Sequence, residues 1–122
     1  MPVKGSCHCK AIQFEVAEAP TELTTCNCSL CSKRGTLVAY YPLAQFKLTT
    51  SPNRVETYQW GDYLGEHNFC GVCGMNTHSK FPDFSTGELD FENPRIAVNA
   101  RLLDDFDVSS LPVTHLNGRD DW

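Results

Sequence analysis

The segment Cys70-Gly71-Val72-Cys73-Gly74 is the part of the sequence that decides the fold. Residues 67–70 and 75–81, on either side of it, predict two strands that meet at this turn. A Cys-x-x-Cys pair followed by glycine is typical of a zinc knuckle, in which two thiolates converge on one metal ion. The glycine can take the positive φ that lets backbone N–H groups point at the sulfur atoms. The segment therefore predicts a β-hairpin whose tip binds zinc.

The other cysteines are clustered in a similar way. The chain has 122 residues and seven cysteines, and every cysteine lies within three residues of another. Zinc prefers four tetrahedral ligands, and two close pairs from distant parts of a chain make one such site. The outer pairs, Cys7 with Cys9 and Cys70 with Cys73, therefore predict a structural zinc site. The remaining group of Cys26, Cys28 and Cys31 has an open fourth position, which is typical of a catalytic zinc site.

The cysteines also have other interpretations. The middle group could take a ligand from an outer pair, either for zinc or for an iron–sulfur cluster, and this would break up the set of four. An odd number of cysteines cannot form a full set of disulfides, and adjacent Cys-x-Cys bridges are strained. Packing alone does not cluster thiols. We prefer the division into four and three because it completes one zinc site and leaves a coherent second group.

Composition narrows the classes of function. The chain has 15 acidic and 10 basic side chains, so its net charge of −5 argues against nucleic-acid binding. No stretch approaches the roughly 18 uninterrupted apolar residues of a membrane span, so we expect no membrane association. The first residues have no apolar signal core, which predicts a cytoplasmic protein. The length and the lack of any linker predict a single domain over residues 1–122.

Most of the chain is predicted to form short strands separated by turns. Alternating apolar residues indicate that residues 11–16 and 95–100 each bury one face. Further strands are predicted at 37–41, 46–50, 55–60, 67–70 and 75–81. Helix is limited to short turns within 28–34 and 104–111, and residues 83–87 with Asn93-Pro94 predict a surface excursion. The fold class is mainly β. The aromatic side chains Tyr40, Tyr41, Tyr58, Trp60 and Phe69 are predicted to fill its core.

Together these motifs are recognisable. The segments Gly5-Ser6-Cys7-His8-Cys9, Cys26-Asn27-Cys28-Ser29-Leu30-Cys31 and Phe69-Cys70-Gly71-Val72-Cys73-Gly74 resemble, in order and spacing, the glutathione-dependent formaldehyde-activating enzyme family, whose GFA domain is related to centromere protein V. The tail resembles it too, with Ala97-Val98-Asn99-Ala100-Arg101, Leu111-Pro112-Val113 and His115-Leu116-Asn117-Gly118. The resemblance covers nearly the whole chain, and all seven cysteine positions match.

The resemblance implies a fold, two zinc ions and a reaction. The fold would be a complex β-fold of small sheets, as in methionine-R-sulfoxide reductases and Rab-binding exchange chaperones. Cys7, Cys9, Cys70 and Cys73 carry over as structural zinc ligands, and Cys26, Cys28 and Cys31 as catalytic zinc ligands. The family's named reaction joins glutathione and formaldehyde to S-(hydroxymethyl)glutathione, and it is classed as a carbon–sulfur lyase acting in reverse.

Residues beside the middle cysteines are candidates for substrate contacts. Glutathione carries two carboxylates, and Lys33 and Arg34 are predicted to bind them, although both also fit solvated surface charges. Asn27, with Ser29 and Ser32, could donate hydrogen bonds to the zinc thiolates or simply suit a tight turn.

The histidines and the alternative functions complete the sequence-based hypotheses. His8 is expected to point away from the metal, whereas His67 and His78 could line a pocket or pack across strands. The sequence does not assign a role to His115. Besides an enzyme that adds a small-molecule thiol such as glutathione to a small aldehyde, two alternatives stay open. They are a non-catalytic, zinc-stabilised binding module and a thiol redox sensor.

Overall fold

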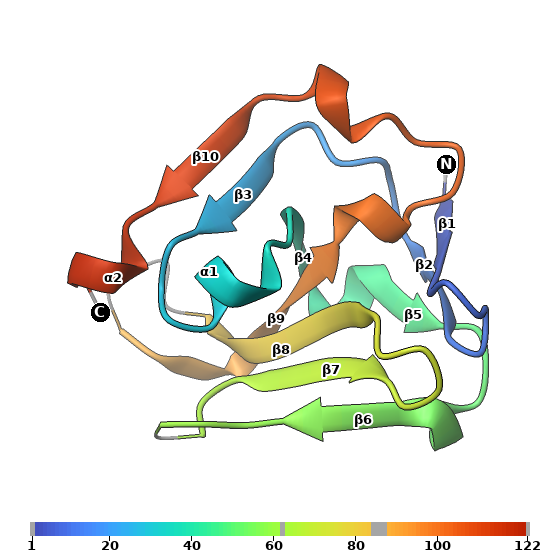
Figure 1. Cartoon of the computed structure of the whole chain (residues 1–122), viewed down its shortest axis with the longest axis horizontal. Coiled ribbons are helices and arrows are strands. Elements are labelled where there is room, and N and C mark those ends of the chain that lie inside the picture. The colour runs from blue at the N-terminus through green and yellow to red at the C-terminus, as the bar shows by residue number, and fades with distance from the viewer. Residues whose placement is uncertain (1, 62, 84–87, 122) are drawn as a thin grey trace.

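The computed structural model describes residues 2–61, 63–83 and 88–121, which form two β-sheets (Figure 1). Within these ranges the strands are β1 (Val3–Ser6), β2 (Gln13–Val16), β3 (Leu23–Cys26), β4 (Val38–Pro42), β5 (Phe46–Leu48), β6 (Val55–Tyr58), β7 (Glu66–Cys70), β8 (Asn76–Asp83), β9 (Asp90–Asn99) and β10 (Val113–Leu116). The helical elements are α1 (Cys31–Arg34), α2 (Gly118–Asp121) and the 3₁₀ turns η1 (Leu43–Gln45), η2 (Pro52–Arg54), η3 (Ala100–Leu102) and η4 (Val108–Ser110). The mainly β fold class is therefore confirmed. No helix in the described ranges is long and apolar enough to cross a membrane.

The two sheets differ in size and in strand direction. The smaller sheet has the order β1-β2-β5, and the larger has the order β10-β3-β4-β9-β8-β7-β6. β10 pairs with β3 in parallel, and the other pairs of neighbouring strands are antiparallel. In Figure 1 the smaller sheet lies at one end of the larger one, and α1 is framed by β3 and β8.

The strands predicted from alternation are all present, with ends shifted by one to a few residues. β1, β3 and β10 are additional. Each is only four residues long, and the sequences Val-Lys-Gly-Ser and Leu-Thr-Thr-Cys of β1 and β3 have no alternating apolar pattern. The helical turns predicted at 28–34 and 104–111 are present as α1 and η4.

The predicted excursion at Asn93-Pro94 is wrong, because β9 runs through both residues. The register with β8 shifts here, since Phe81 faces Arg95 while Asp83 faces Asp90. The extra residues of β9 form a bulge, and a proline in a bulge breaks no regular hydrogen bond of the ladder. Residues 84–87, the rest of the predicted excursion, lie outside the described residues.

The main core lies between the two sheets. Phe14 and Val16 of β2 pack in one buried cluster with Ile96 and Val98 of β9, as the alternation predicts. The Phe14 ring stacks on Phe46 of β5 at 5.5 Å between centroids. Residues 96–99 at the end of β9 are buried on both faces, whereas residues 91–93 near its start are exposed. β9 is also the central strand of the large sheet.

The predicted aromatic core is only partly correct. Tyr41 is buried, but Tyr58 and Trp60 are exposed, and Tyr40 is 39% exposed. Tyr40 packs edge-on against Phe81. Tyr58 belongs to the short strand β6 at the edge of the large sheet, and its side chain is 52% exposed.

Candidate metal centres

Four cysteines from two distant turns form the first cluster, which we call the outer cluster. Cys7 and Cys9 lie between β1 and β2, and Cys70 and Cys73 lie at the turn between β7 and β8. Their four sulfur atoms all lie within 4.8 Å of one another. The Cys9 Sγ is 3.7 Å from the Cys7 Sγ and 3.6 Å from the Cys70 Sγ. Sulfur atoms about 2.3 Å from a tetrahedral zinc lie about 3.8 Å apart, so this donor set fits one zinc ion.

Backbone groups support the outer cluster on both sides. The N–H of Ile12 donates to the Cys7 Sγ at 3.4 Å. The N–H groups of Val72 and Cys73 both donate to the Cys70 Sγ, at 3.3 and 3.5 Å. Gly74 has a φ of +77°, which confirms the predicted knuckle geometry. N–H donors of this kind stabilise negative charge on sulfur, as a metal ligand requires.

The thiols of the outer cluster differ in pKa. Burial opposes ionisation of Cys73, but hydrogen bonds from the backbone of Cys9 and Met75 and from neighbouring thiols lower its pKa to about 6. For Cys9, the backbone N–H of Ala11 lowers the pKa, but lost hydration and bonding to the neighbouring thiols outweigh it and raise the pKa to about 11. Four thiolates this close repel one another, so full ionisation requires a bound cation.

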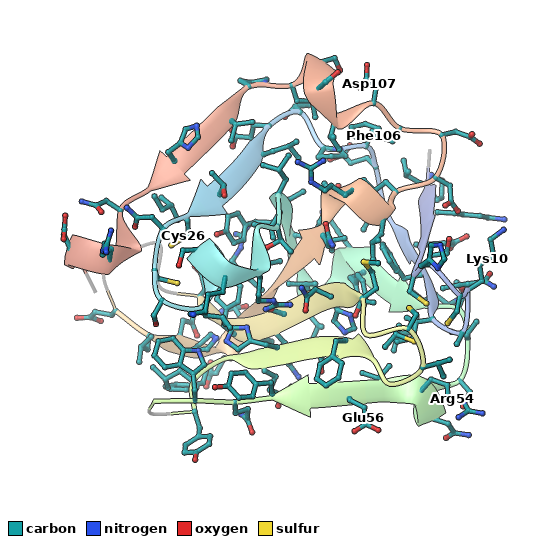
Figure 2. All side chains as sticks on the ribbon, in the orientation of Figure 1. Lys10, Cys26, Arg54, Glu56, Phe106 and Asp107 are labelled. Atoms are coloured by element: carbon teal, nitrogen blue, oxygen red, sulfur yellow. The ribbon has the colours of Figure 1, made fainter. Side chains whose placement is uncertain are left out.

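The inner cluster consists of Cys26 at the end of β3, Cys28 in the following loop and Cys31 at the start of α1. Their sulfur atoms also lie within 4.8 Å of one another. The N–H of Cys28 donates to the Cys26 Sγ, and the N–H of Cys31 donates to the Cys28 Sγ, both at 3.4 Å. In Figure 2, Cys26 lies on the opposite side of the molecule from Lys10, the residue after Cys9. The seven cysteines, all free thiols, thus separate into groups of four and three that could each hold a metal ion.

The inner thiols also need a cation to ionise together. Burial raises the pKa of Cys31 to about 12, and the neighbouring Cys28 and Cys26 add to this rise. Burial works against ionisation of Cys28 too, but the N–H and thiol of Cys31 outweigh it and lower the Cys28 pKa. Three thiolates with an open fourth position are a donor set that zinc accepts.

A cavity of about 540 Å³ opens at the inner cluster, and all three of its cysteines line it. The cavity lies between the loop and helix that carry the inner cluster and the face of the large sheet formed by β7, β8 and β9. Much of its wall is apolar: Leu30, Val38, Tyr40, Trp60, Leu64, Phe81, Leu89 and Ala97. A molecule bound there would lose most of its water.

The structure separates the two basic residues predicted to bind substrate. Arg34 lines the cavity, whereas Lys33 is exposed and is not among the residues that line it. The Arg34 Nε is buried and has no hydrogen-bond partner within the described residues. Burial lowers the pKa of Arg34, and the charge of Cys31 opposes this shift.

Two of the four histidines line the same cavity. The His67 Nδ1 lies 3.0 Å from the Ser79 Oγ, and the His78 Nδ1 lies 3.0 Å from the Thr77 Oγ1. Burial lowers the pKa of His78 to about 4, and burial together with the charge of Arg34 lowers the pKa of His67. Both rings are therefore neutral at neutral pH. His8 and His115 are exposed.

Asn27, between two inner cysteines, bonds to the C-terminal segment rather than to sulfur. Its Nδ2 donates to the Asn117 Oδ1 at 2.8 Å, and its Oδ1 accepts from the Arg119 N–H at 3.0 Å. Its backbone N–H donates to the Leu116 carbonyl at 3.2 Å. No local spacing indicates this contact, because it depends on the parallel pairing of β10 with β3. The tail motif is its only sequence signal.

The chain matches one family model and is similar to a solved structure. Residues 2–115, which include all seven cysteines, match the family model described as glutathione-dependent formaldehyde-activating enzyme. Among solved structures, the chain is similar to the crystal structure of a Rhodobacter sphaeroides protein, with 28% sequence identity and a TM-score of 0.72. The match covers 91% of this chain and 99% of the Rhodobacter sphaeroides chain.

Proposed function

The chain belongs to the glutathione-dependent formaldehyde-activating enzyme family, and we propose that it adds a thiol such as glutathione to formaldehyde or a related small aldehyde. The observation that carries this proposal is the position of the inner cluster. Cys26, Cys28 and Cys31 place three sulfur atoms within 4.8 Å of one another on the wall of a cavity large enough for small-molecule substrates. These three cysteines would hold a metal ion with one ligand fewer than the four that zinc prefers, and a substrate thiol could supply the fourth.

In this proposal the chain binds two zinc ions with different roles. Cys7, Cys9, Cys70 and Cys73 hold the structural ion, and Cys26, Cys28 and Cys31 hold the catalytic one. When bound at the inner cluster, zinc supplies positive charge that keeps a substrate thiol ionised at neutral pH. The backbone N–H groups of Cys28 and Cys31 keep two of its sulfur ligands in place.

The protein itself contributes orientation and a dry site. The apolar wall favours desolvation of a bound substrate. Arg34 lines the cavity, and its Nε has no hydrogen-bond partner in the described part of the chain, so this side chain is available to a carboxylate of either substrate. One carbon–sulfur bond forms between the thiol and the carbonyl carbon, and the thiol proton ends on the carbonyl oxygen. The reverse reaction is that of a carbon–sulfur lyase. We place the reaction in the cytoplasm, where thiols stay reduced.

The decisive experiment replaces one inner cysteine. We expect Cys28→Ser to lower the zinc content from two ions per chain to one. Glutathione binding should weaken, and the rate of S-(hydroxymethyl)glutathione formation, followed by NMR exchange spectroscopy, should fall about 100-fold or more. The matched control is Ser32→Ala, because Ser32 is exposed in the adjacent helix α1 and its hydroxyl donates only to the nearby Ser29 carbonyl. A cooperative thermal unfolding transition in each variant would verify that both are folded.

The same variant separates the alternatives. A zinc-stabilised binding module predicts that Cys28→Ser changes no reaction rate, because the wild-type protein has none. A redox sensor predicts that peroxide oxidises the inner thiols reversibly and releases zinc, which intact-protein mass spectrometry detects. Unchanged zinc content and unchanged activity in Cys28→Ser would rule out the proposed function.

A further inference from the structure

The cavity beside the inner cluster is much larger than formaldehyde, and its wall suits a less polar occupant than the whole of glutathione, whose thiol alone has to reach the inner cysteines. Its volume is about 540 Å³, whereas formaldehyde has only two non-hydrogen atoms. Glutathione has two carboxylates, an ammonium group and two amides, and each of these needs a hydrogen-bond partner when it loses water. The wall of the cavity is largely aromatic and aliphatic, with Tyr40, Trp60 and Phe81 among its rings.

The polar side chains in the wall mostly bond within the protein. These bonds run from Thr25 Oγ1 to the Thr36 carbonyl at 3.4 Å, from Thr77 Oγ1 to the Asn68 carbonyl at 3.3 Å, between His67 Nδ1 and Ser79 Oγ at 3.0 Å, and from Asn99 Nδ2 to the Asn76 carbonyl at 2.9 Å. A bound molecule with many polar groups would therefore compete with these bonds.

Arg34 is different, since its Nε is buried with no hydrogen-bond partner in the described part of the chain. Among the described residues that line the cavity there is no aspartate or glutamate to pair with it. The two histidines in the wall, His67 and His78, are neutral at neutral pH. The cavity thus offers one fixed positive side chain, which matches one carboxylate on a bound molecule.

We propose that the cavity binds an aromatic molecule with a single carboxylate, and that the aldehyde form of such a molecule is the carbonyl substrate. The aromatic ring packs against the apolar wall, and the carboxylate binds Arg34. The carbonyl carbon then faces the inner cysteines. The inference rests on the proposed function for its chemistry: the thiol sulfur bonds to the aldehyde carbon, the thiol proton moves to the oxygen, and a hemithioacetal forms without oxidation or reduction.

Binding is tested first with a molecule that cannot react. We expect 4-methylbenzoate to bind the zinc-loaded protein in isothermal titration calorimetry, and the neutral 4-methylbenzamide to bind at least about tenfold more weakly. Arg34→Gln should weaken binding of 4-methylbenzoate at least about tenfold without changing that of the amide. Arg34→Lys keeps the positive charge but loses the planar guanidinium, so its affinity for 4-methylbenzoate should lie between those of the wild type and Arg34→Gln.

Arg54→Gln is the matched control, because Arg54 is exposed and lies on the opposite side of the molecule from Cys26 in Figure 2. It should bind 4-methylbenzoate as the wild type does. The proposal is overturned if 4-methylbenzoate does not bind, or if Arg34→Gln lowers zinc content at the inner cluster while leaving carboxylate binding unchanged. The second result would mean that Arg34 only balances the charge of the cysteines.

The reaction is then measured with 4-formylbenzoate and glutathione. We expect kcat/KM for 4-formylbenzoate to exceed kcat/KM for formaldehyde by about tenfold or more. In Arg34→Gln the two values should be similar. Turnover of formaldehyde without binding of 4-methylbenzoate overturns this inference and leaves the proposed function intact. Binding of 4-methylbenzoate without turnover of any aldehyde supports the assignment of the cavity and overturns the proposed function.

Discussion

At the scale of single residues, Gly5 is the position where an added carbon meets the tightest packing. A Cβ built there would collide with the Phe14 ring, 2.6 Å from its Cε2, and would lie 3.0 Å from the Leu102 carbonyl oxygen. Phe14 is buried and stacked on Phe46, so it cannot move aside. We expect Gly5→Ala to lower the free energy of unfolding by about 1–3 kcal/mol, measured by urea denaturation.

Gly71→Ala is the control for this prediction. Its added Cβ would lie 3.0 Å from the Cγ of Glu56, an exposed and flexible side chain that can shift. We expect a change within about 0.5 kcal/mol. Equal losses in the two variants would contradict the role assigned to the Phe14 ring.

His78 makes stability depend on pH. Burial lowers its pKa from 6.5 to about 4, so between these values the unfolded chain binds a proton that the folded chain does not. The contribution of neutral, buried His78 to the free energy of unfolding is therefore fully present above pH 6.5 and is lost as the pH drops toward 4. We expect this histidine to account for a loss of about 2 kcal/mol between pH 7.5 and pH 5, measured by urea denaturation at both values.

The variant His78→Phe keeps a ring against Phe46, whose centroid lies 4.6 Å from that of His78, and it removes the titrating group. The free energy of unfolding of this variant should fall by about 2 kcal/mol less than that of the wild type between pH 7.5 and pH 5. His115→Gln, at an exposed site, should retain the wild-type dependence. If His78→Phe keeps the full dependence, the effect belongs to other groups.

At the scale of elements, the strands that could be predicted have an alternating apolar pattern or a run of β-forming residues. Phe14 and Val16 alternate because one side of β2 faces the main core, and Ile12, just before this strand, is buried in the second cluster with Cys7 and Cys70. β3 and β10 could not be predicted in this way, because they pair in parallel across a long stretch of sequence and have no one-sided pattern of their own. The bulge that admits Pro94 depends on register, which the local sequence does not encode.

The candidate site was predictable to a similar extent. Both cysteine clusters follow from spacing, since each is built from pairs or triplets close in sequence. The difference between Lys33 and Arg34 does not follow, because adjacent residues in α1 point in different directions and only Arg34 meets the cavity. The cavity itself depends on the wall formed by distant strands.

Asn27 links the loop of the inner cluster to the C-terminal segment, so this link should affect metal binding. Asn27→Ala removes its side-chain bonds to Asn117 and to the Arg119 N–H. We expect zinc affinity at the inner cluster to fall about 10–100-fold, measured by competition with a chromogenic chelator, while the outer cluster keeps its ion.

Asn93→Ala is the control, because Asn93 is exposed and its side chain bonds only to the nearby Asp90. It should leave both zinc affinities unchanged. If Asn27→Ala also binds zinc at the wild-type affinity, the C-terminal segment does not position the inner cysteines.

At the scale of the whole molecule, the outer cluster joins the two sheets. Cys7 and Cys9 connect strands of the small sheet, and Cys70 and Cys73 connect strands of the large one. A second buried group, with Ile12 among its members, packs around Cys7 and Cys70. A metal ion at this cluster therefore fixes the position of one sheet against the other.

Removing all metal should therefore lower stability far more than emptying the inner cluster. We expect exhaustive chelation to lower Tm by about 10 °C or more in calorimetry, and added zinc to restore it. Cys28→Ser should show the same fall on chelation, since the ion that matters is at the outer cluster. An unchanged Tm in metal-free protein would contradict a structural role for this cluster.

The pairing of β10 with β3 has a consequence for how the protein is made. The outer cluster needs only residues up to Cys73, so it can close while the ribosome is still adding the rest of the chain. The loop with Cys26 and Cys28 rests on Leu116, Asn117 and Arg119, which emerge much later. A nascent chain that has emerged only as far as Cys73 therefore has the four thiols of the outer cluster but lacks the segment that supports the inner one.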